Sequence, residues 1–347
     1  MITIAFCIMT VRKHTIIALL LAIPFWFSCT KKNGTPEVVR EEIAAKPVVM
    51  AGVNWADARD NFIDGWIIPS GLEADDDYNT VSAKADAVLK GFAANMVGVN
   101  TVRLPINPPS VLEGWWTSYA GAIDQALKNN FKVILCCWER ASSKDGLVDD
   151  PTTFWLMWQV VVNKYQNNPD VYFEIFNEPH GYSLVQLTSV YEEWLTRYPS
   201  VPHQRVLLSG TGYSENIVGI GADSRFTNCL LALHNYAFWA TRSLEGWEQS
   251  WRMAYGSYAD RTIVTEYGAG MTTGKNYTGT IGGDNEIAYI VGSTNLFRIN
   301  GISNVYWPGL RDGDSYSIQT RTGSGNNIIL ETTNKSGLSH IRYGWGL

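Results

Sequence analysis

The chain has 347 residues, which is enough for one large domain or two of average size. An apolar fraction of 46% supports a sizeable core and excludes a disordered chain. A net charge of −6 and a pI near 5.4 argue against a nucleic-acid-binding protein, which would carry a basic surface.

The N-terminal segment, residues 1–29, has the composition of an export signal. Positive charge at residues 11–14 precedes an apolar run at 15–27, which is too short for a comfortable membrane span. Cys29 then follows a small residue, as in a bacterial lipoprotein signal, and we predict that it is lipidated. The alternative is an ordinary cleaved secretory signal, and either Met1 or Met9 can be the true start.

The polar segment at residues 30–46 has no apolar period and is predicted to be a flexible tether. We therefore expect an exported protein, held in the bacterial cell envelope by its lipid. With an ordinary signal it would be periplasmic or secreted. The lipid is the only membrane contact that we expect.

Apolar strands and helical segments alternate along the rest of the chain. Eight strands are predicted, at residues 47–55, 99–105, 131–138, 171–177, 205–209, 228–236, 261–267 and 301–307. Helices are predicted at residues 81–96, 115–129, 151–165, 183–198, 244–258, 285–300 and 335–343. Long polar loops are expected at residues 57–78 and 311–327.

The strands are continuously apolar, which is typical of a parallel sheet covered by helices on both sides. Eight such units predict an α/β fold of the (β/α)8 TIM barrel type, formed by one domain over residues 47–347. An open doubly wound sheet is the alternative, but no Gly-x-Gly-x-x-Gly follows an early strand.

The cysteines and aromatic residues have mostly structural explanations. Cys136 and Cys137 are adjacent on a strand, so they point to opposite faces, and with Cys229 they are expected in the core. No disulfide framework is predicted. The 14 Trp and 17 Tyr are mostly core residues, but some could stack on sugar rings in a carbohydrate-binding cleft.

Polar and aromatic residues gather where the strands end. In a barrel the carboxyl ends of the strands face one common site. Each residue alone has a bland explanation, such as a surface ion pair or a core histidine, but their convergence favours a binding or catalytic site. The residues at these ends are Asn54, Trp55, Arg103, Trp138, Asn177, Glu178, His234, Tyr236, Glu266 and Trp307.

Glu178 and Glu266 suggest the chemistry of this site. A pair of carboxylates that flank a bond is what glycosidic cleavage requires, one acting as an acid and the other as a nucleophile or base. Asn177 could bond the sugar 2-hydroxyl, and Arg103 and Tyr236 could hold the nucleophile charged and oriented.

Three motifs together resemble glycoside hydrolase family 5, the cellulase family of clan A. They are Asn177-Glu178-Pro179 on the fourth strand, Glu266 on the seventh and Arg103-Leu104-Pro105 on the second. The resemblance covers residues 48–345 and implies a (β/α)8 barrel.

The resemblance also implies roles for the site residues. Glu178 would be the acid/base, Glu266 the nucleophile and Asn177 the contact to the 2-hydroxyl. Arg103, His234 and Tyr236 would support the nucleophile and the sugar, and Trp307 would be the stacking platform.

Two details are specific to this chain. The family commonly has a histidine near the end of the third strand, where this chain has Trp138, which could take over part of that surface by stacking. Glu174 lies on the fourth strand four residues before Glu178, so it should be deeper. We therefore predict Glu178 and not Glu174 as the proton donor.

The predicted function is a retaining glycoside hydrolase that cleaves a β-linked plant polysaccharide, foremost an endo-β-1,4-glucanase. A β-mannanase, a xyloglucanase or an exo-acting β-glycosidase would use the same scaffold. A surface lipoprotein that only captures glycans is the non-enzymatic alternative, although it would not need both glutamates. The expected partner is a β-glucan or related oligosaccharide, bound by a monomer.

No cofactor and no metal are expected. The chain has five histidines and lacks the His-x-His and His-Glu-x-x-His spacings of metalloenzymes.

Overall fold

All eight predicted strands are present in the structure, a computed structural model that describes residues 45–347. They lie in chain order, each parallel to the next, and β1 pairs with both β2 and β8, so the barrel is closed. The predicted (β/α)8 barrel is therefore confirmed. The strands are β1 (Ala51–Trp55), β2 (Thr101–Ile106), β3 (Lys132–Cys137), β4 (Val171–Glu174), β5 (Val206–Ser209), β6 (Leu230–His234), β7 (Thr262–Glu266) and β8 (Ser303–Leu310).

The predicted signal segment, the lipidation of Cys29 and nearly all of the tether lie outside the described residues and stay predictions. Within residues 45–347, no helix has the length and apolar character needed to cross a membrane.

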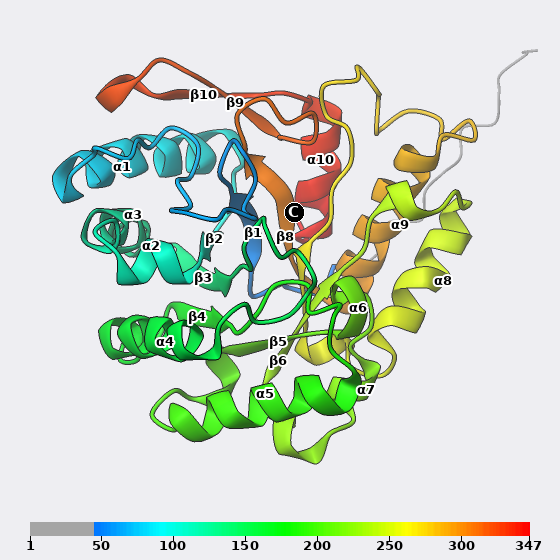
Figure 1. Ribbon diagram of the computed structural model, residues 1–347. Coiled ribbons are helices and arrows are strands. Elements are labelled where there is room, and N and C mark those ends of the chain that lie inside the picture. The colour runs from blue at the N-terminus through cyan, green and yellow to red at the C-terminus, as the bar shows by residue number, and fades with distance from the viewer. Residues whose placement is uncertain (1–44) are drawn as a thin grey trace, which may run out of the picture. The chain divides into compact units, whose positions relative to one another are not determined.

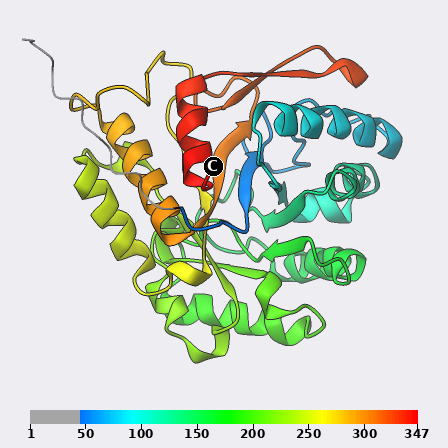
Figure 2. The same ribbon diagram turned by 180° about the vertical axis from the view of Figure 1, so that it is seen from behind.

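Helices surround the strands and cover their outer faces, as Figures 1 and 2 show from opposite sides. All seven predicted helices are present with ends shifted by at most a few residues. α1 begins earlier than predicted because the Asp77 side chain caps it by accepting from the Thr80 N–H. The helices of four or more residues are α1 (Tyr78–Asn95), α2 (Pro108–Leu112), α3 (Trp116–Lys128), α4 (Pro151–Tyr165), α5 (Leu184–Arg197), α6 (Thr211–Ser214), α7 (Val218–Gly221), α8 (Leu244–Tyr255), α9 (Asn285–Asn300) and α10 (Lys335–Gly344).

The barrel interior is layered, because successive side chains of a strand point to opposite faces. Val133 and Leu135 pack outward with the helices, whereas Ile134 packs inward with Leu207 and Val305 in an apolar plug. Cys136, two residues further along β3, joins a second inner cluster nearer the strands' carboxyl ends. The polar strand-end residues lie between plug and mouth.

Three features of the fold differ from the sequence prediction. β4 ends at Glu174, so Asn177 and Glu178 lie in the loop that follows the strand. The short helices α2, α6 and α7 span too few residues to give a periodic signal. The predicted polar loop 311–327 contains β9 (Gln319–Thr322), which pairs antiparallel with β10 (Ile329–Thr332).

The β9–β10 hairpin lies against α1, at the top of Figure 1. Its Leu330 is buried against Gly91 of α1, where a Cβ would come within 2.7 Å of the leucine side chain. Glycine at this position therefore allows the hairpin to approach the helix closely.

We expect Leu330→Ala to lower the free energy of unfolding by about 2–5 kcal/mol, because it leaves a cavity between hairpin and helix. Chemical denaturation measures the change. Ile329→Ala is the matched control, since Ile329 is 60% exposed and its loss should have little effect. Equal losses for the two variants would contradict the packing of the hairpin on α1.

Candidate active site

Arg103, on β2, lies at the centre of the polar residues inside the barrel. Its guanidinium donates to Glu174 from Nε (2.6 Å) and Nη2 (2.9 Å), and to Glu266 from Nη1 (2.5 Å). It also donates to Asn54 Oδ1 (3.0 Å) and Asn177 Oδ1 (2.8 Å). The arginine is fully buried, so these bonds are made away from water. They position residues from three further strand ends around one cation.

Glu266, at the end of β7, is buried and held by two donors. Arg103 bonds its Oε1, and the Tyr236 hydroxyl donates to its Oε2 at 2.9 Å. Burial raises the pKa of Glu266, while the charge of Arg103 acts to lower it. Both donors bond best to a charged carboxylate. The carboxylate is thus fixed in one orientation, and its two donors favour the anion against the effect of burial.

Glu178 lies just beyond β4 in a strained conformation. Its φ of 48° is in the left-handed region, which side chains other than glycine rarely adopt. Burial raises its pKa to about 7, and no arginine bonds it directly as one bonds Glu266. A carboxyl group with this pKa is protonated in part of the population at neutral pH. It can therefore donate a proton to a ligand.

His234, at the end of β6, joins the two glutamates. Its Nδ1 lies 3.0 Å from Glu178 Oε1 and 3.7 Å from Glu266 Oε2, and its Nε2 lies 3.0 Å from Thr265 Oγ1. Burial lowers the pKa of the ring. The imidazole is therefore neutral near pH 7 and orients Glu178 without adding a charge.

Asn177 has a free donor beside this network. Its Oδ1 accepts from Arg103, which orients the amide. Its buried Nδ2 has no hydrogen-bond partner among the described residues, and neither has Trp138 Nε1. A buried donor without a partner costs about 1–3 kcal/mol, and a ligand hydroxyl would remove that cost. The Asn177 Nδ2, beside the two glutamates, therefore indicates a position for a hydroxylated ligand.

Trp138 and Trp307 lie side by side at the mouth of the barrel. Their rings stack with centroids 5.7 Å apart, and Phe62 meets Trp138 edge-on at 4.8 Å. Only 3% of Trp138 and 9% of Trp307 are exposed. One face of Trp307 is thus covered by Trp138, and we call Phe62, Trp138 and Trp307 the aromatic wall. The predicted stacking of a sugar on Trp307 stays a prediction.

Among the predicted site residues, Trp55 lies away from the site. It is completely buried in the core between strands and helices, and its Nε1 donates to the carbonyl of Ser70 at 2.9 Å. Asn54 faces inward, so its neighbour on the strand faces outward. The prediction that Trp55 contacts substrate is wrong for this reason.

Glu174 lies below the ligand position, as expected from its place in β4. It is completely buried and makes its ion pair with Arg103, whereas the Glu178 side chain is 17% exposed. Of the two, Glu178 is the one that lines a cavity.

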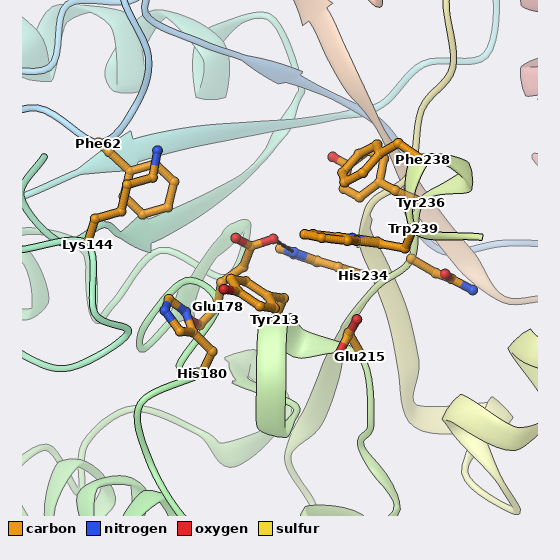
Figure 3. Close-up of a pocket in the computed structure, with 11 residues that line it drawn as sticks. Phe62, Lys144, Glu178, His180, Tyr213, Glu215, His234, Tyr236, Phe238 and Trp239 are labelled. Carbon is orange, nitrogen blue, oxygen red and sulfur yellow. Dashed lines mark hydrogen bonds and ion pairs between the residues drawn. The ribbon is translucent and has the colours of Figure 1, made fainter.

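That cavity has a volume of about 350 Å³ (Figure 3). Glu178 and His234 lie between Phe62 and Lys144 on one side and Tyr236, Phe238 and Trp239 on the other. His180 and Tyr213 also line it near Glu178, with their rings stacked at a centroid distance of 4.2 Å.

The sequence analysis did not identify the lining residues that come from loops. Lys144, His180, Tyr213, Phe238 and Trp239 all follow strand ends, and this position was the available signal. Which loop residues turn toward the site depends on the path of each loop, which periodicity does not reveal.

The protein itself supplies a positive charge to the clustered carboxylates of the site. Glu178, His234 and Glu266 offer ligand atoms within 4.8 Å of one another. The Arg103 guanidinium already supplies a positive charge to this group, and a cation bound there would be repelled by it. At a second acidic group, Glu73, Asp75 and Asp76, the Lys84 ammonium similarly bonds Glu73 and Asp76.

Comparison with protein families matches residues 71–309 to the cellulase model of glycosyl hydrolase family 5. A search of curated proteins gave no match.

Solved structures with the same fold include endoglucanases of low sequence identity. Cel5A (EG2) of Hypocrea jecorina has a TM-score of 0.60 at 18% identity, covering 85% of this chain and 98% of that one. The catalytic domain of the major endoglucanase of Xanthomonas campestris has a TM-score of 0.62 at 15% identity, covering 88% and 99%. An endocellulase of Pyrococcus horikoshii in complex with cellotetraose has a TM-score of 0.63 at 14% identity, covering 86% and 93%.

We expect Arg103→Met to lower the free energy of unfolding by about 3–5 kcal/mol, because Glu174 and Glu266 would be left buried without their cation. Thermal and chemical denaturation measure this loss. Arg225→Met is the matched control, since Arg225 pairs with Glu192 and Asp223 at the surface, where solvent screens the interaction. A stable Arg103→Met variant would contradict the central role of this cation.

Proposed function

Because this chain belongs to glycosyl hydrolase family 5, as its match over residues 71–309 establishes, we propose that it hydrolyses β-1,4-linked glucan with retention of configuration. The observation that carries this proposal is the closeness of the two catalytic carboxylates. Oxygens of Glu178 and Glu266 lie within 4.8 Å of each other. Retaining enzymes hold their carboxyl groups about 5–5.5 Å apart, whereas inverting enzymes leave about 6.5–9.5 Å for a water molecule.

In the first step, Glu266 attacks the anomeric carbon and a glycosyl–enzyme bond forms as the glycosidic bond breaks. Glu178 gives its proton to the departing oxygen, for which a pKa of about 7 is suited. In the second step the ionised Glu178 takes a proton from water, and the hydroxide displaces Glu266 from the sugar.

The surrounding residues support these two roles. Arg103 and Tyr236 hold Glu266 as an oriented anion, and His234 orients Glu178. The free Nδ2 of Asn177 is suited to bond the sugar 2-hydroxyl, a contact that strengthens in the transition state.

Glucan is the proposed sugar because the similar solved structures include endoglucanases and a complex with cellotetraose. β-Mannan and xyloglucan remain alternatives that use the same carboxylates. A panel of these polysaccharides, with the released reducing ends measured, decides among them. Tight binding with no product would support the glycan-capturing alternative and overturn the enzymatic one.

We expect Glu178→Gln and Glu266→Gln to lose hydrolysis of cellulose oligosaccharides while they stay folded. Loss of general acid catalysis costs about 10²–10⁴-fold in rate. Glu178→Gln should keep bond cleavage on an aryl glycoside with a good leaving group, since that group needs no proton, whereas Glu266→Gln should lose both substrates. Wild-type turnover of oligosaccharide by either variant would refute the assignment.

We expect kcat/KM on oligosaccharides to fall as the pH rises through about 7. Burial raises the pKa of Glu178 to this value, and the acid is lost above it. Glu139 is the control, because burial also raises its pKa to about 7 although it only bonds the backbone of Asp145 and Gly146. In Glu139→Gln, kcat/KM should still fall as the pH rises through about 7. If kcat/KM no longer falls in this variant, the titrating group is Glu139 and not Glu178.

A further inference from the structure

The cavity at the catalytic glutamates continues into a second cavity of about 360 Å³. Four residues line both cavities, namely Glu215, Asn235, Tyr236 and Trp239. Trp239 is 61% exposed, so a large part of its ring is open to a ligand at the junction of the two cavities. A sugar chain that is bound at Glu178 and extends into the second cavity therefore passes this ring.

Two neighbouring rings of the loop after β6 face water in this region. Phe238 is 59% exposed and, like Trp239, lines the catalytic cavity. Figure 3 shows both rings on the same side of the cavity, and we call these two residues the aromatic ledge. Rings that stay exposed contribute little to the hydrophobic core, whereas their apolar faces can pack on sugar rings.

The loop that carries the aromatic ledge is held by one side chain, that of Asn285 at the start of α9. Its Nδ2 donates to the carbonyls of Ala237 (3.0 Å) and Ala240 (2.8 Å), which lie on either side of the ledge. Its Oδ1 accepts from the N–H of Arg242 (2.9 Å) and from Trp247 Nε1 (3.0 Å) on α8.

This amide group is fixed in one orientation. The NH2 group donates two hydrogen bonds and the oxygen accepts two, which is the full capacity of an asparagine side chain. The reverse orientation would turn the NH2 group toward two N–H donors. Within residues 45–347, no other side chain bonds the backbone of residues 237–242. The path of the loop therefore depends on Asn285.

The same helix holds the residue before Tyr236 in a separate way. Tyr289, one turn after Asn285, donates from its hydroxyl to the carbonyl of Asn235 at 2.6 Å. Tyr236, which follows Asn235, donates to Glu266. Because Tyr289 bonds Asn235, loss of the Asn285 side chain should free the aromatic ledge and leave the hydrogen bond to the nucleophile in place.

We propose that Asn285 is a positioning residue for substrate binding, which holds the aromatic ledge in the orientation that packs on the sugar chain. Asn285 lines neither cavity, so it acts through Phe238 and Trp239. A ledge that is already ordered spares the substrate the entropic cost of ordering a loop and two rings on binding. The inference rests on the proposed glycosidase function and names a residue that governs how tightly this site binds its glucan.

Steady-state kinetics with cellopentaose test this role. Asn285→Ala should raise KM about tenfold, because the substrate must then order the loop and its rings. The value of kcat should stay nearly unchanged, since the hydrogen bonds of the two glutamates remain. Asn285→Asp keeps the two bonds to the side-chain oxygen but loses the two donated bonds that reach Ala237 and Ala240. It should therefore also raise KM.

Asn334→Ala is the matched control. Asn334 likewise joins a loop to a helix, because its Nδ2 donates to the carbonyl of Lys275 and its Oδ1 accepts from the Gly337 N–H. It lines neither cavity, so its loss should lower the free energy of unfolding and leave KM unchanged. An equal rise of KM in this variant would mean that general loosening is the cause, and it would overturn the positioning role.

Trp239→Ala tests the aromatic ledge directly and serves if Asn285→Ala does not fold, since an exposed ring adds little to stability. It should raise KM as Asn285→Ala does. An unchanged KM in Trp239→Ala, or in both Asn285→Asp and a folded Asn285→Ala, overturns this inference and leaves the proposed function intact. If the wild-type enzyme cleaves no β-glycoside, the proposed function fails and this inference with it.

Discussion

The buried guanidinium of Arg103 is the interaction on which the rest of the site depends. It is bonded by Asn54 from β1, by Glu174 and Asn177 from β4 and the loop after it, and by Glu266 from β7. A shift of one residue in any of these strands would turn the bonded side chain to the other face. One cation therefore fixes the relative register of strands that are far apart in sequence. The same contacts determine where the two catalytic glutamates lie.

The two glutamates have different hydrogen-bond partners, and this difference separates their roles. Glu266 receives hydrogen bonds from a guanidinium and a phenol, both of which favour its anion. The Glu178 side chain is bonded by the neutral imidazole of His234 and by no cation within residues 45–347, and burial raises its pKa to about 7. The two carboxyl groups differ because Arg103 and Tyr236 donate hydrogen bonds to Glu266 and not to Glu178.

The sequence predicted the parts of the structure that follow from local patterns. Eight continuous apolar strands predicted the barrel, and the polar residues at their ends predicted the position of the site. The alternation of side chains along a strand could also have excluded Trp55 from the site. Asn54 and Trp55 are neighbours on one strand and cannot both face inward. The path of the loop after β1 could not be predicted, since it depends on distant hydrogen bonds such as those from Asn107 to Ile63. Phe62 was therefore missed as part of the aromatic wall, although Trp138 and Trp307 were identified.

Trp138 has to be considered together with its neighbours. Its ring lies between Trp307 and Phe62, and the Arg103 guanidinium carbon lies 5.7 Å from the ring centre. A smaller residue at this position would leave a gap in the wall and admit water close to the ion pair of Arg103 and Glu266. Water would raise the local dielectric and weaken that ion pair. The wall thus shields the interaction that keeps Glu266 charged. Replacement of Trp138 by a smaller residue should for this reason lower the rate of cleavage, even though Trp138 makes no hydrogen bond to either glutamate.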